Sequence, residues 1–236
     1  MSQKLWEASS RIKKKSELFA FEKFISEKLN KKFNNDFKKI HKWSVENSED
    51  FWDLFWDYSK IKGSKSKIKI KKSRVFHKNI FLPKSKLNFA ENLLSKNNNE
   101  KAVTFISENG FKEIRNWKQL NQNVSKVYKF LKDIKIRRKD RIVAYMPNII
   151  EIVEAFIASS STGAIWSSCS PDFGVNGVIE RFSQIKPKVL FVTKEYFYNG
   201  KRINILERIP EIIKKVPSIK YVIICNYPGQ KKFKKD

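Results

Sequence analysis

Few residues of this chain could support redox or metal chemistry. The 236-residue sequence holds two cysteines and two histidines. Cys169 and Cys225 lie in apolar stretches, with no Cys-x-x-Cys spacing and no accompanying histidine, so we expect buried free thiols in a reducing compartment. His41 and His77 have no acidic or thiol partner at a telling spacing, and we expect them to be structural or exposed. The sequence therefore predicts no metal site.

The sequence also indicates no signal peptide and has no long hydrophobic run. The first fifteen residues contain no apolar core of a signal peptide. The most apolar segment, residues 149–166, is interrupted by Glu151, Glu154 and several serines, which makes it too polar to span a bilayer. We expect a cytoplasmic protein with no membrane partner.

Acidic residues are scarce beside basic ones. The chain has 50 Lys and Arg against 24 Asp and Glu, a formal net charge of +26. Such a balance can indicate a nucleic-acid or acidic-membrane partner. Here the excess is mostly lysine, is spread along the chain and accompanies no recognition motif. We expect no nucleic-acid partner, and a basic nucleic-acid binder stays an alternative.

Motifs for phosphate binding and catalysis are absent as well. The sequence has no Gly-x-x-x-x-Gly-Lys-Ser/Thr, no Gly-x-Gly-x-x-Gly and no paired carboxylates after adjacent strands. One loop stands out, residues 170–174, because it follows the apolar stretch 164–169, which we expect to be a strand buried on both faces. Ligands of parallel sheets bind at the carboxyl ends of strands, and Asp172 is the acidic residue there. An ordinary turn is the alternative.

A second loop, residues 198–202, combines two cations with a glycine. Lys201 and Arg202 follow Gly200, and the pattern predicts that this loop enters a helix. Backbone N–H groups at a helix start, a close approach at glycine and two positive charges would suit a phosphate group. A solvated turn is the alternative in so lysine-rich a chain.

The first third of the chain is expected to be a helical extension. With 41% hydrophobic residues, the chain is long enough to bury a sizeable core. Residues 16–29 have helical spacing of apolar residues, and Ser48 is expected to cap a second helix with four aromatic residues on one face. These are Phe51, Trp52, Phe55 and Trp56. Residues 61–74 are expected to be an exposed, mobile link.

The rest of the chain is expected to be α/β. Asn109-Gly110 predicts a hairpin of strands 102–107 and 111–115, and Asn116 with Gln119 predicts a capped helix through residue 134. Strands 141–146, 164–169, 189–193 and 221–225 then alternate with helices 148–162, 175–185 and one within 203–216 that is broken at Pro210. Gly163 is expected to end the first of these helices. This order predicts the first half of a doubly wound parallel sheet, and therefore a fragment of a longer protein.

Several stretches, in order along the chain, carry a family resemblance. They are residues 5–7, 43–46, 51–52, 87–94, 140–148, 163–174, 181–191 and 198–201. Together they resemble the acetoacetate–CoA ligases (acetoacetyl-CoA synthetases) of the acyl-adenylate-forming superfamily. Residues 166–174, Trp-Ser-Ser-Cys-Ser-Pro-Asp-Phe-Gly, are the most specific part, and Ala8 departs from the proline usual there.

The resemblance implies a two-step ligase that uses acetoacetate, ATP, Mg²⁺ and coenzyme A (CoA). It implies an amino-terminal extension over residues 1–100 and the first part of an AMP-binding (adenylation) domain over 101–236. The family's phosphate loop, acyl pocket and catalytic lysine lie beyond the equivalent of Asp236, so no catalytic residue is expected here and the chain alone is expected to be inactive. Another short-chain acyl-CoA synthetase, or a non-catalytic fragment that binds CoA or a partner, is the alternative.

The resemblance also implies five CoA-facing residues, Phe173, Gly174, Tyr198, Lys201 and Arg202. Lys201 stands where acetyl-CoA synthetases have an arginine that contacts phosphate. Tyr198 replaces a second such arginine, which removes one expected contact. The oligomeric state is not predicted.

Overall fold

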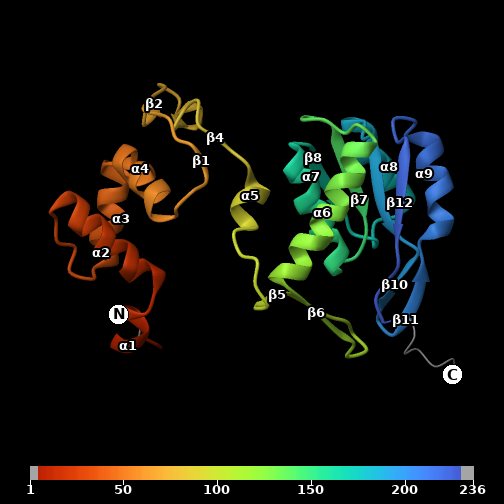
Figure 1. Ribbon diagram of the computed structural model, residues 1–236, viewed down its shortest axis with the longest axis horizontal. Helices are drawn as coiled ribbons and strands as arrows, with labels where there is room; N and C mark the ends of the chain where they lie inside the picture. Colours follow the sequence, from red (N-terminus) through yellow and green to blue (C-terminus); the bar gives the residue numbers. More distant parts are fainter. Residues whose placement is uncertain (1–4, 230–236) are drawn as a thin grey trace. The chain divides into compact units, whose positions relative to one another are not determined.

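The computed structural model describes residues 5–229 (Figure 1). The chain divides between Leu87 and Asn88 into two compact units. Each unit has its own hydrophobic core, and each is described by itself.

The first unit is built on four helices. They are α1 (Ser10–Lys14), α2 (Glu17–Leu29), α3 (Phe37–Glu46) and α4 (Ser48–Tyr58). Ser16 caps α2 through a 3.2 Å bond from Phe19 N–H. Phe21 is the centre of the packing, because its ring makes edge contacts with Phe51, Phe55 and Tyr58 at 5.1–5.8 Å. The predicted aromatic face of α4 is thus packing surface, although Trp52 and Phe55 remain partly exposed.

Two predictions for this unit were wrong. Ser48 is the first residue of α4 rather than its cap; the cap position is Asn47, whose amide donates to Trp43 O of the preceding helix. Residues 61–74 are mostly exposed, as expected, but they are not an unstructured link. They contain β1 (Gly63–Ser64), which pairs antiparallel with β4 (Lys86–Leu87), and β2 (Ile70–Lys71), which pairs antiparallel with β3 (Ile80–Phe81); a 3₁₀ turn at Phe76–Lys78 precedes β3.

The second unit begins with a short helix, a hairpin and a long helix. These are α5 (Phe89–Leu93), β5 (Lys101–Ile106) with β6 (Lys112–Asn116), and α6 (Trp117–Asp133). The hairpin and the capping box are confirmed: Asn116 Oδ1 accepts from Gln119 N–H at 2.8 Å, and Gln119 Oε1 accepts from Asn116 N–H at 3.0 Å.

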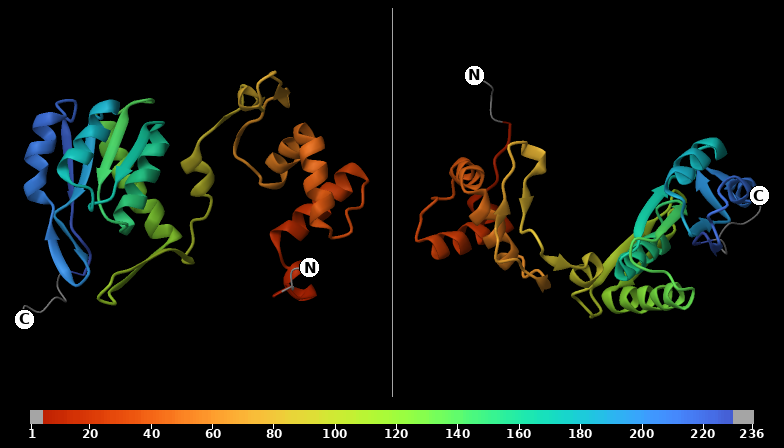
Figure 2. Two further views of the ribbon diagram at one scale, coloured as in Figure 1. Left: turned by 180° about the vertical axis from the view of Figure 1, so that it is seen from behind. Right: turned by 90° about the horizontal axis from the view of Figure 1, so that it is seen from above.

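The centre of the second unit is a parallel sheet, as predicted. Its strands are β7 (Arg141–Tyr145), β8 (Ile165–Cys169), β9 (Val189–Thr193) and β12 (Tyr221–Cys225), in the order β12-β9-β7-β8. The crossover helices are α7 (Ile150–Thr162), α8 (Val175–Ile185) and α9 (Ile209–Lys215). Helices α6 and α7 cover one face, and α8 and α9 cover the other (Figure 2). This arrangement is the expected start of a doubly wound α/β domain.

Several local predictions for the second unit were wrong. β8 is an edge strand of the four, with Ile165 52% exposed, so it is not buried on both faces. Cys169 is buried as expected, whereas Cys225 on the other edge strand is only half-buried. Pro210 lies in the first turn of α9 and does not break it, because proline is compatible with that position. None of the helices within residues 5–229 is long and apolar enough to cross a membrane.

Candidate functional site

The order of the strands singles out one place on the sheet. β7 and β9 are neighbours, yet the chain leaves β7 towards α7 on one face and leaves β9 towards α9 on the other. Their carboxyl ends therefore form a topological switch point, where ligands of open α/β sheets bind. The loop 170–174, which follows β8, borders this point.

A buried tyrosine at the end of β7 holds this loop in place. Tyr145 is fully buried, and its hydroxyl lies 2.7 Å from Phe173 O and 3.1 Å from Pro171 O. Both carbonyls therefore point inward. Because the N–H of a trans peptide points opposite to its carbonyl, the Gly174 N–H is directed away from Tyr145.

Two further side chains reach the same loop from the hairpin region after β9. Arg208 Nη1 donates to Tyr145 Oη at 2.7 Å and to Pro171 O at 3.1 Å. The Tyr196 hydroxyl donates to Asp172 Oδ1 at 2.8 Å, and Asp172 Oδ2 accepts from the Ser170 hydroxyl at 2.8 Å. Burial, together with the bond to Asp172, raises the pKa of Tyr196 to about 12. The loop is thus tied to three separate segments of the chain.

The far side of the loop is open. Gly174 is the residue that precedes α8, it forms no side-chain cap, and a Cβ placed on it would meet nothing within 4 Å. The Arg181 guanidinium lies over the Phe173 ring, 4.6 Å from its centroid, and Phe173 is 39% exposed. The start of α8 therefore offers unobstructed backbone N–H groups beside an accessible aromatic ring.

The second group of predicted residues lies on a hairpin, not at a helix start. Tyr198 ends β10 (Glu195–Tyr198), and Lys201 and Arg202 begin β11 (Lys201–Asn204). Asn199 and Gly200, both with positive φ, form the turn. The prediction that this loop enters a helix was therefore wrong. Sequence reasoning missed the hairpin because its strands are only four residues long.

The hairpin tip also faces acidic groups. Arg202 forms an ion pair with Glu195, and Gly200 N–H donates to the Glu108 carboxylate at 3.3 Å. Tyr198 is 57% exposed, and Lys201 is exposed. The base of the hairpin touches loop 170–174 through Tyr196, whereas Tyr198 lies two residues, roughly 6–7 Å, further along the strand.

Three residues of this site were not predicted from the sequence. Tyr145, Tyr196 and Arg208 belong to a buried strand, to the missed hairpin and to the 3₁₀ turn before α9. A tyrosine at the carboxyl end of a predicted central strand was the one available signal, since a buried phenol needs a partner. No feature of the sequence distinguishes Arg208 from the many other Lys and Arg residues of this basic chain.

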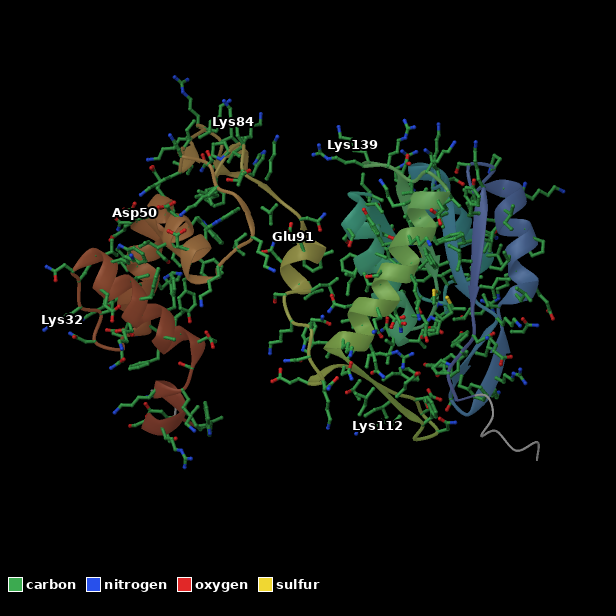
Figure 3. All side chains as sticks on the ribbon, in the orientation of Figure 1. Lys32, Asp50, Lys84, Glu91, Lys112 and Lys139 are labelled. Carbon is green, nitrogen blue, oxygen red and sulfur yellow. The ribbon has the colours of Figure 1, made fainter. Side chains whose placement is uncertain are left out.

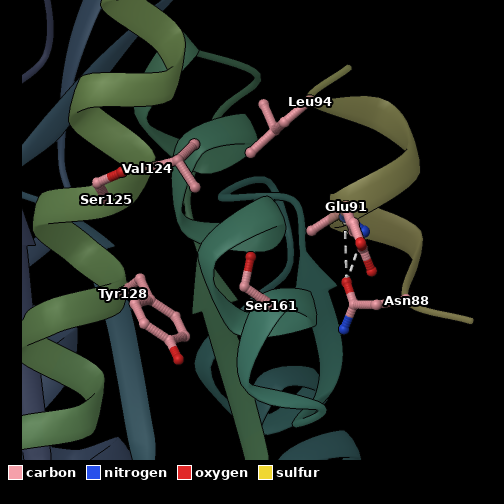
Figure 4. Close-up of a pocket in the computed structure, with 8 residues that line it drawn as sticks. Asn88, Glu91, Leu94, Val124, Ser125, Tyr128 and Ser161 are labelled. Atoms are coloured by element: carbon pink, nitrogen blue, oxygen red, sulfur yellow. Dashed lines mark hydrogen bonds between the residues drawn. The ribbon is translucent and has the colours of Figure 1, made fainter. Parts of the chain in front are cut away.

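The second unit has several cavities, and one of about 400 Å³ is lined by Ser167, Glu180, Arg181, Gln184 and Ile185 on β8 and α8. A small one, of about 120 Å³, lies at the ends of β7 and β8 and is lined in part by Asn148, Cys169 and Pro171. A larger one, of about 360 Å³, lies between α5, α6 and α7, with Tyr128, Ser125, Ser161 and Glu91 around it (Figure 4). Asn88 caps α5 beside this cavity and donates to Ser160 O at 2.9 Å. None of the five predicted site residues lines any of these three cavities.

Thiols and histidines do not contribute a reactive centre. Burial raises the pKa of the Cys169 thiol, against the effect of Arg181. Burial and the nearby Glu151 and Glu154 raise the pKa of Cys225 to about 11. His41 and His77 are exposed, and residues 5–229 contain no group of three His, Cys, Asp or Glu residues that could hold a metal ion.

The opposite edge of the sheet, where the strands begin, is basic. Lys139, Lys186 and Lys220 are exposed there, and Figure 3 shows Lys139 at this edge. Backbone bonds join the loops, from Lys220 N–H to Lys188 O for example, while the Asp140 carboxylate is paired with Lys188 at 2.7 Å. Basic side chains thus gather at the edge that loop 170–174 does not occupy.

Comparison with known proteins shows a family match and several similar proteins. The family model "AMP-binding enzyme" matches residues 91–235. The acetoacetyl-CoA synthetase of Gallus gallus is 36% identical over 230 residues, which are 96% of this chain and 34% of that protein. The acetoacetyl-coenzyme A synthetase of Rhizobium meliloti (strain 1021) is 36% identical over 95% of this chain and 34% of its own length.

A solved structure agrees with this result. Acetoacetyl-CoA synthetase from Streptomyces lividans superimposes with a TM-score of 0.91 and 26% identity, over 100% of this chain and 36% of that one. The chain spans about a third of the length of the curated relatives it matches. The switch-point sheet, the sequence matches and the superposition agree that this chain belongs to the family of AMP-binding enzymes.

Proposed function

We propose that this chain is the amino-terminal part of an ATP-dependent acetoacetate–CoA ligase. The family match and the relatives named acetoacetyl-CoA synthetases support this proposal. Residues 1–100 are the proposed extension and 101–236 the proposed first part of the adenylation domain. The two free thiols support a cytoplasmic, reducing environment.

The proposed reaction has two steps. The acetoacetate carboxylate attacks the α-phosphorus of ATP, and pyrophosphate leaves. The CoA sulfur then attacks the acyl carbonyl of the adenylate, a new C–S bond forms, and AMP leaves with the electrons of the C–O bond. Activation is required because a free carboxylate is a poor electrophile, and Mg²⁺ would offset phosphate charge. Since residues 5–229 offer no metal-binding group of side chains, no Mg²⁺ ligand is assigned to them.

The part of this reaction that we assign to this chain is binding of CoA. Residues 170–174 border the switch point, and Tyr145 directs the Gly174 N–H outward. The uncapped start of α8 suits a phosphate of CoA, and the exposed Phe173 ring, backed by Arg181, suits its adenine base. This fixed, open loop is the observation that carries the proposal.

Lys201 and Tyr198 are proposed as a secondary contact. Lys201 is an exposed cation that can attract a phosphate, and Tyr198 is an exposed ring. The Glu108 carboxylate at the hairpin tip would compete with an anionic ligand, and Arg202 is already paired with Glu195. We therefore place the main contact at loop 170–174.

Calorimetric titration of CoA into the 236-residue chain tests the proposal. Gly174→Val would place branched carbons over the start of α8, and we expect at least about tenfold weaker binding, equivalent to about 1.4 kcal/mol. Lys201→Ala should weaken binding less, and Lys220→Ala, an exposed lysine at the opposite edge of the sheet, serves as the control. Equal affinity of wild type and Gly174→Val would refute the assignment. Acetoacetate-dependent pyrophosphate release by this chain alone would contradict the placement of the ATP site outside it.

A further inference from the structure

Arg208 has an unusual set of partners for an arginine in so charged a chain. Its Nη1 carries two hydrogens, and these meet the Tyr145 hydroxyl at 2.7 Å and Pro171 O at 3.1 Å. Within residues 5–229 no carboxylate forms an ion pair with it. The guanidinium is half-buried and bridges segments that are 63 and 37 residues away in sequence.

The bonds of Arg208 decide where the Tyr145 proton goes. A phenol has one proton to donate, yet two carbonyl oxygens, of Pro171 and Phe173, lie within its reach. Arg208 supplies a donor to Pro171 O and also donates to the Tyr145 oxygen. The Tyr145 proton is therefore available to Phe173 O, the closer of the two at 2.7 Å.

The hydrogen bond from Tyr145 to Phe173 O fixes the orientation of the peptide that joins Phe173 to Gly174. While Phe173 O stays bound to Tyr145, the plane of that peptide cannot turn, and the Gly174 N–H keeps its outward direction. The charged Arg208 guanidinium also makes the Tyr145 hydroxyl a stronger hydrogen-bond donor to Phe173 O, because hydrogen bonds in a chain polarise one another.

We propose that Arg208 is a positioning residue for CoA, one that orients the Phe173–Gly174 peptide before the ligand arrives. The inference rests on the proposed role of loop 170–174 in CoA binding. Without Arg208, Pro171 O competes for the Tyr145 proton, and the peptide samples orientations in which the Gly174 N–H is lost to the ligand. Orientation in advance spares the ligand the cost of ordering the loop.

Variants of Arg208 test this inference against a matched control. Arg208→Met keeps the length of the aliphatic stem and removes both donors, and Arg208→Lys keeps a charged donor. Arg141→Met is the control, because Arg141 also donates to backbone carbonyls, Ile185 O at 2.8 Å, Lys186 O at 2.9 Å and Lys139 O at 3.3 Å, but at the opposite edge of the sheet. Tyr145→Phe, which deletes the relay hydroxyl, is the second variant if Arg208→Met does not fold.

Two measurements are made on each variant: calorimetric titration with CoA, and amide hydrogen exchange of the peptide that covers residues 170–175. Arg208→Met should bind CoA about tenfold more weakly, with faster exchange confined to this peptide. Arg208→Lys should restore most of the affinity, and Arg141→Met should change neither readout. Wild-type affinity in Arg208→Met, or an equal loss in Arg141→Met, overturns the inference. If wild type does not bind CoA, the proposed function fails, and unchanged exchange in Arg208→Met would then separately overturn the positioning role.

Discussion

The Tyr196 hydroxyl donates to Asp172 Oδ1 across 2.8 Å, although the two residues are 24 positions apart in the chain. Tyr196 is 6% exposed and lies on β10, at the base of the hairpin that carries Tyr198 and Lys201. Asp172 lies in the loop that carries Phe173 and Gly174. This hydrogen bond therefore joins the two groups of residues, Phe173 with Gly174 and Tyr198 with Lys201, that the sequence analysis assigned to one ligand.

Removal of this hydroxyl should loosen the link. Tyr196→Phe leaves Asp172 with its bond from Ser170 only, and we expect a loss of about 1 kcal/mol of unfolding free energy, the usual worth of such a bond. Tyr198→Phe, two residues along the same strand and exposed, should change stability by less than about 0.5 kcal/mol. Urea unfolding measures both; an equal effect of the two substitutions would contradict the assigned role.

The same residue gives a spectroscopic prediction. The pKa of Tyr196 is raised to about 12, by burial first and by Asp172 second, so the folded chain keeps a proton that the unfolded chain loses near pH 10. Its contribution to stability is therefore present below pH 10 and is lost as the pH rises towards 12. The difference in tyrosinate absorbance between wild type and Tyr196→Phe should titrate near 12. A difference that titrates near 10 would contradict the buried bond.

The sheet was predictable from sequence because each of its strands is a short apolar run between turn residues. β7 and β9 are almost fully buried, and their sequences, Arg-Ile-Val-Ala-Tyr and Val-Leu-Phe-Val-Thr, each contain a run of four apolar or aromatic residues that indicates this burial. The hairpin β10–β11 was not predicted, because Asn199-Gly200 was interpreted as leading into a helix and the strand before it, Glu-Tyr-Phe-Tyr, shows no sustained alternation of apolar and polar residues. Its pairing depends on contacts with the rest of the fold.

The site was predictable only in part, for a related reason. Phe173 and Gly174 follow a strand and could be placed at its carboxyl end by topology. Arg208 could not, because nothing in a local pattern shows that a cation of the 3₁₀ turn reaches a tyrosine 63 residues earlier. The prediction of a mobile link at residues 61–74 was wrong for the same reason, because Lys65 and Lys69 form ion pairs with acidic residues on α4 that no local pattern indicates.

Gly163 offers a test of backbone conformation. It follows α7 with φ +76°, and a Cβ on it would lie 3.1 Å from Arg138 Cγ. Gly163→Ala should cost about 1–2 kcal/mol because an L-residue is strained in this region. Gly177→Ala is the contrast: Gly177 lies inside α8, its Cβ would make an ordinary 3.5 Å contact with Phe173, and a gain of about 0.5–1 kcal/mol is expected. Equal stabilities in thermal unfolding would show that φ does not decide the effect.

Lys65 should hold the first unit together more than its charge suggests. Its ammonium group lies 2.7 Å from Asp53, 2.8 Å from Asp57 and 2.8 Å from Asp53 O. Although burial opposes it, these partners raise the pKa of Lys65. Lys65→Met should destabilise this unit by about 1–3 kcal/mol, because the acidic groups lose a charged hydrogen-bond donor. Lys72→Met, whose ion pair with Glu49 is exposed, should cost less than about 1 kcal/mol. Chemical unfolding followed by tryptophan fluorescence compares the two.

Glu151 should make stability depend on pH in the unusual direction. One guanidinium, of Arg115, faces Glu113, Glu151 and Glu154 at the hairpin and α7, and one oxygen of Glu151 is buried without a hydrogen bond. Burial is the main cause that raises the pKa of Glu151. The folded chain therefore binds a proton that the unfolded chain releases near pH 4.5. Stability therefore falls as the pH rises from the pKa of Glu151 in the unfolded chain to its higher pKa in the folded chain, and the loss persists above that range.

Glu151→Gln removes this penalty without a change of shape. Its unfolding midpoint should exceed that of wild type at pH 7–8, and the two should converge as the pH falls below about 4.5, where the wild-type carboxyl is neutral in both states. Glu100→Gln is the matched contrast, because the bond from Lys96 lowers the pKa of that exposed carboxyl. Its contribution has the opposite sign: it is present above the ordinary pKa and lost in acid. A Glu151→Gln variant less stable than wild type at pH 8 would mean that the ion pair with Arg115 outweighs the cost of burying the charge.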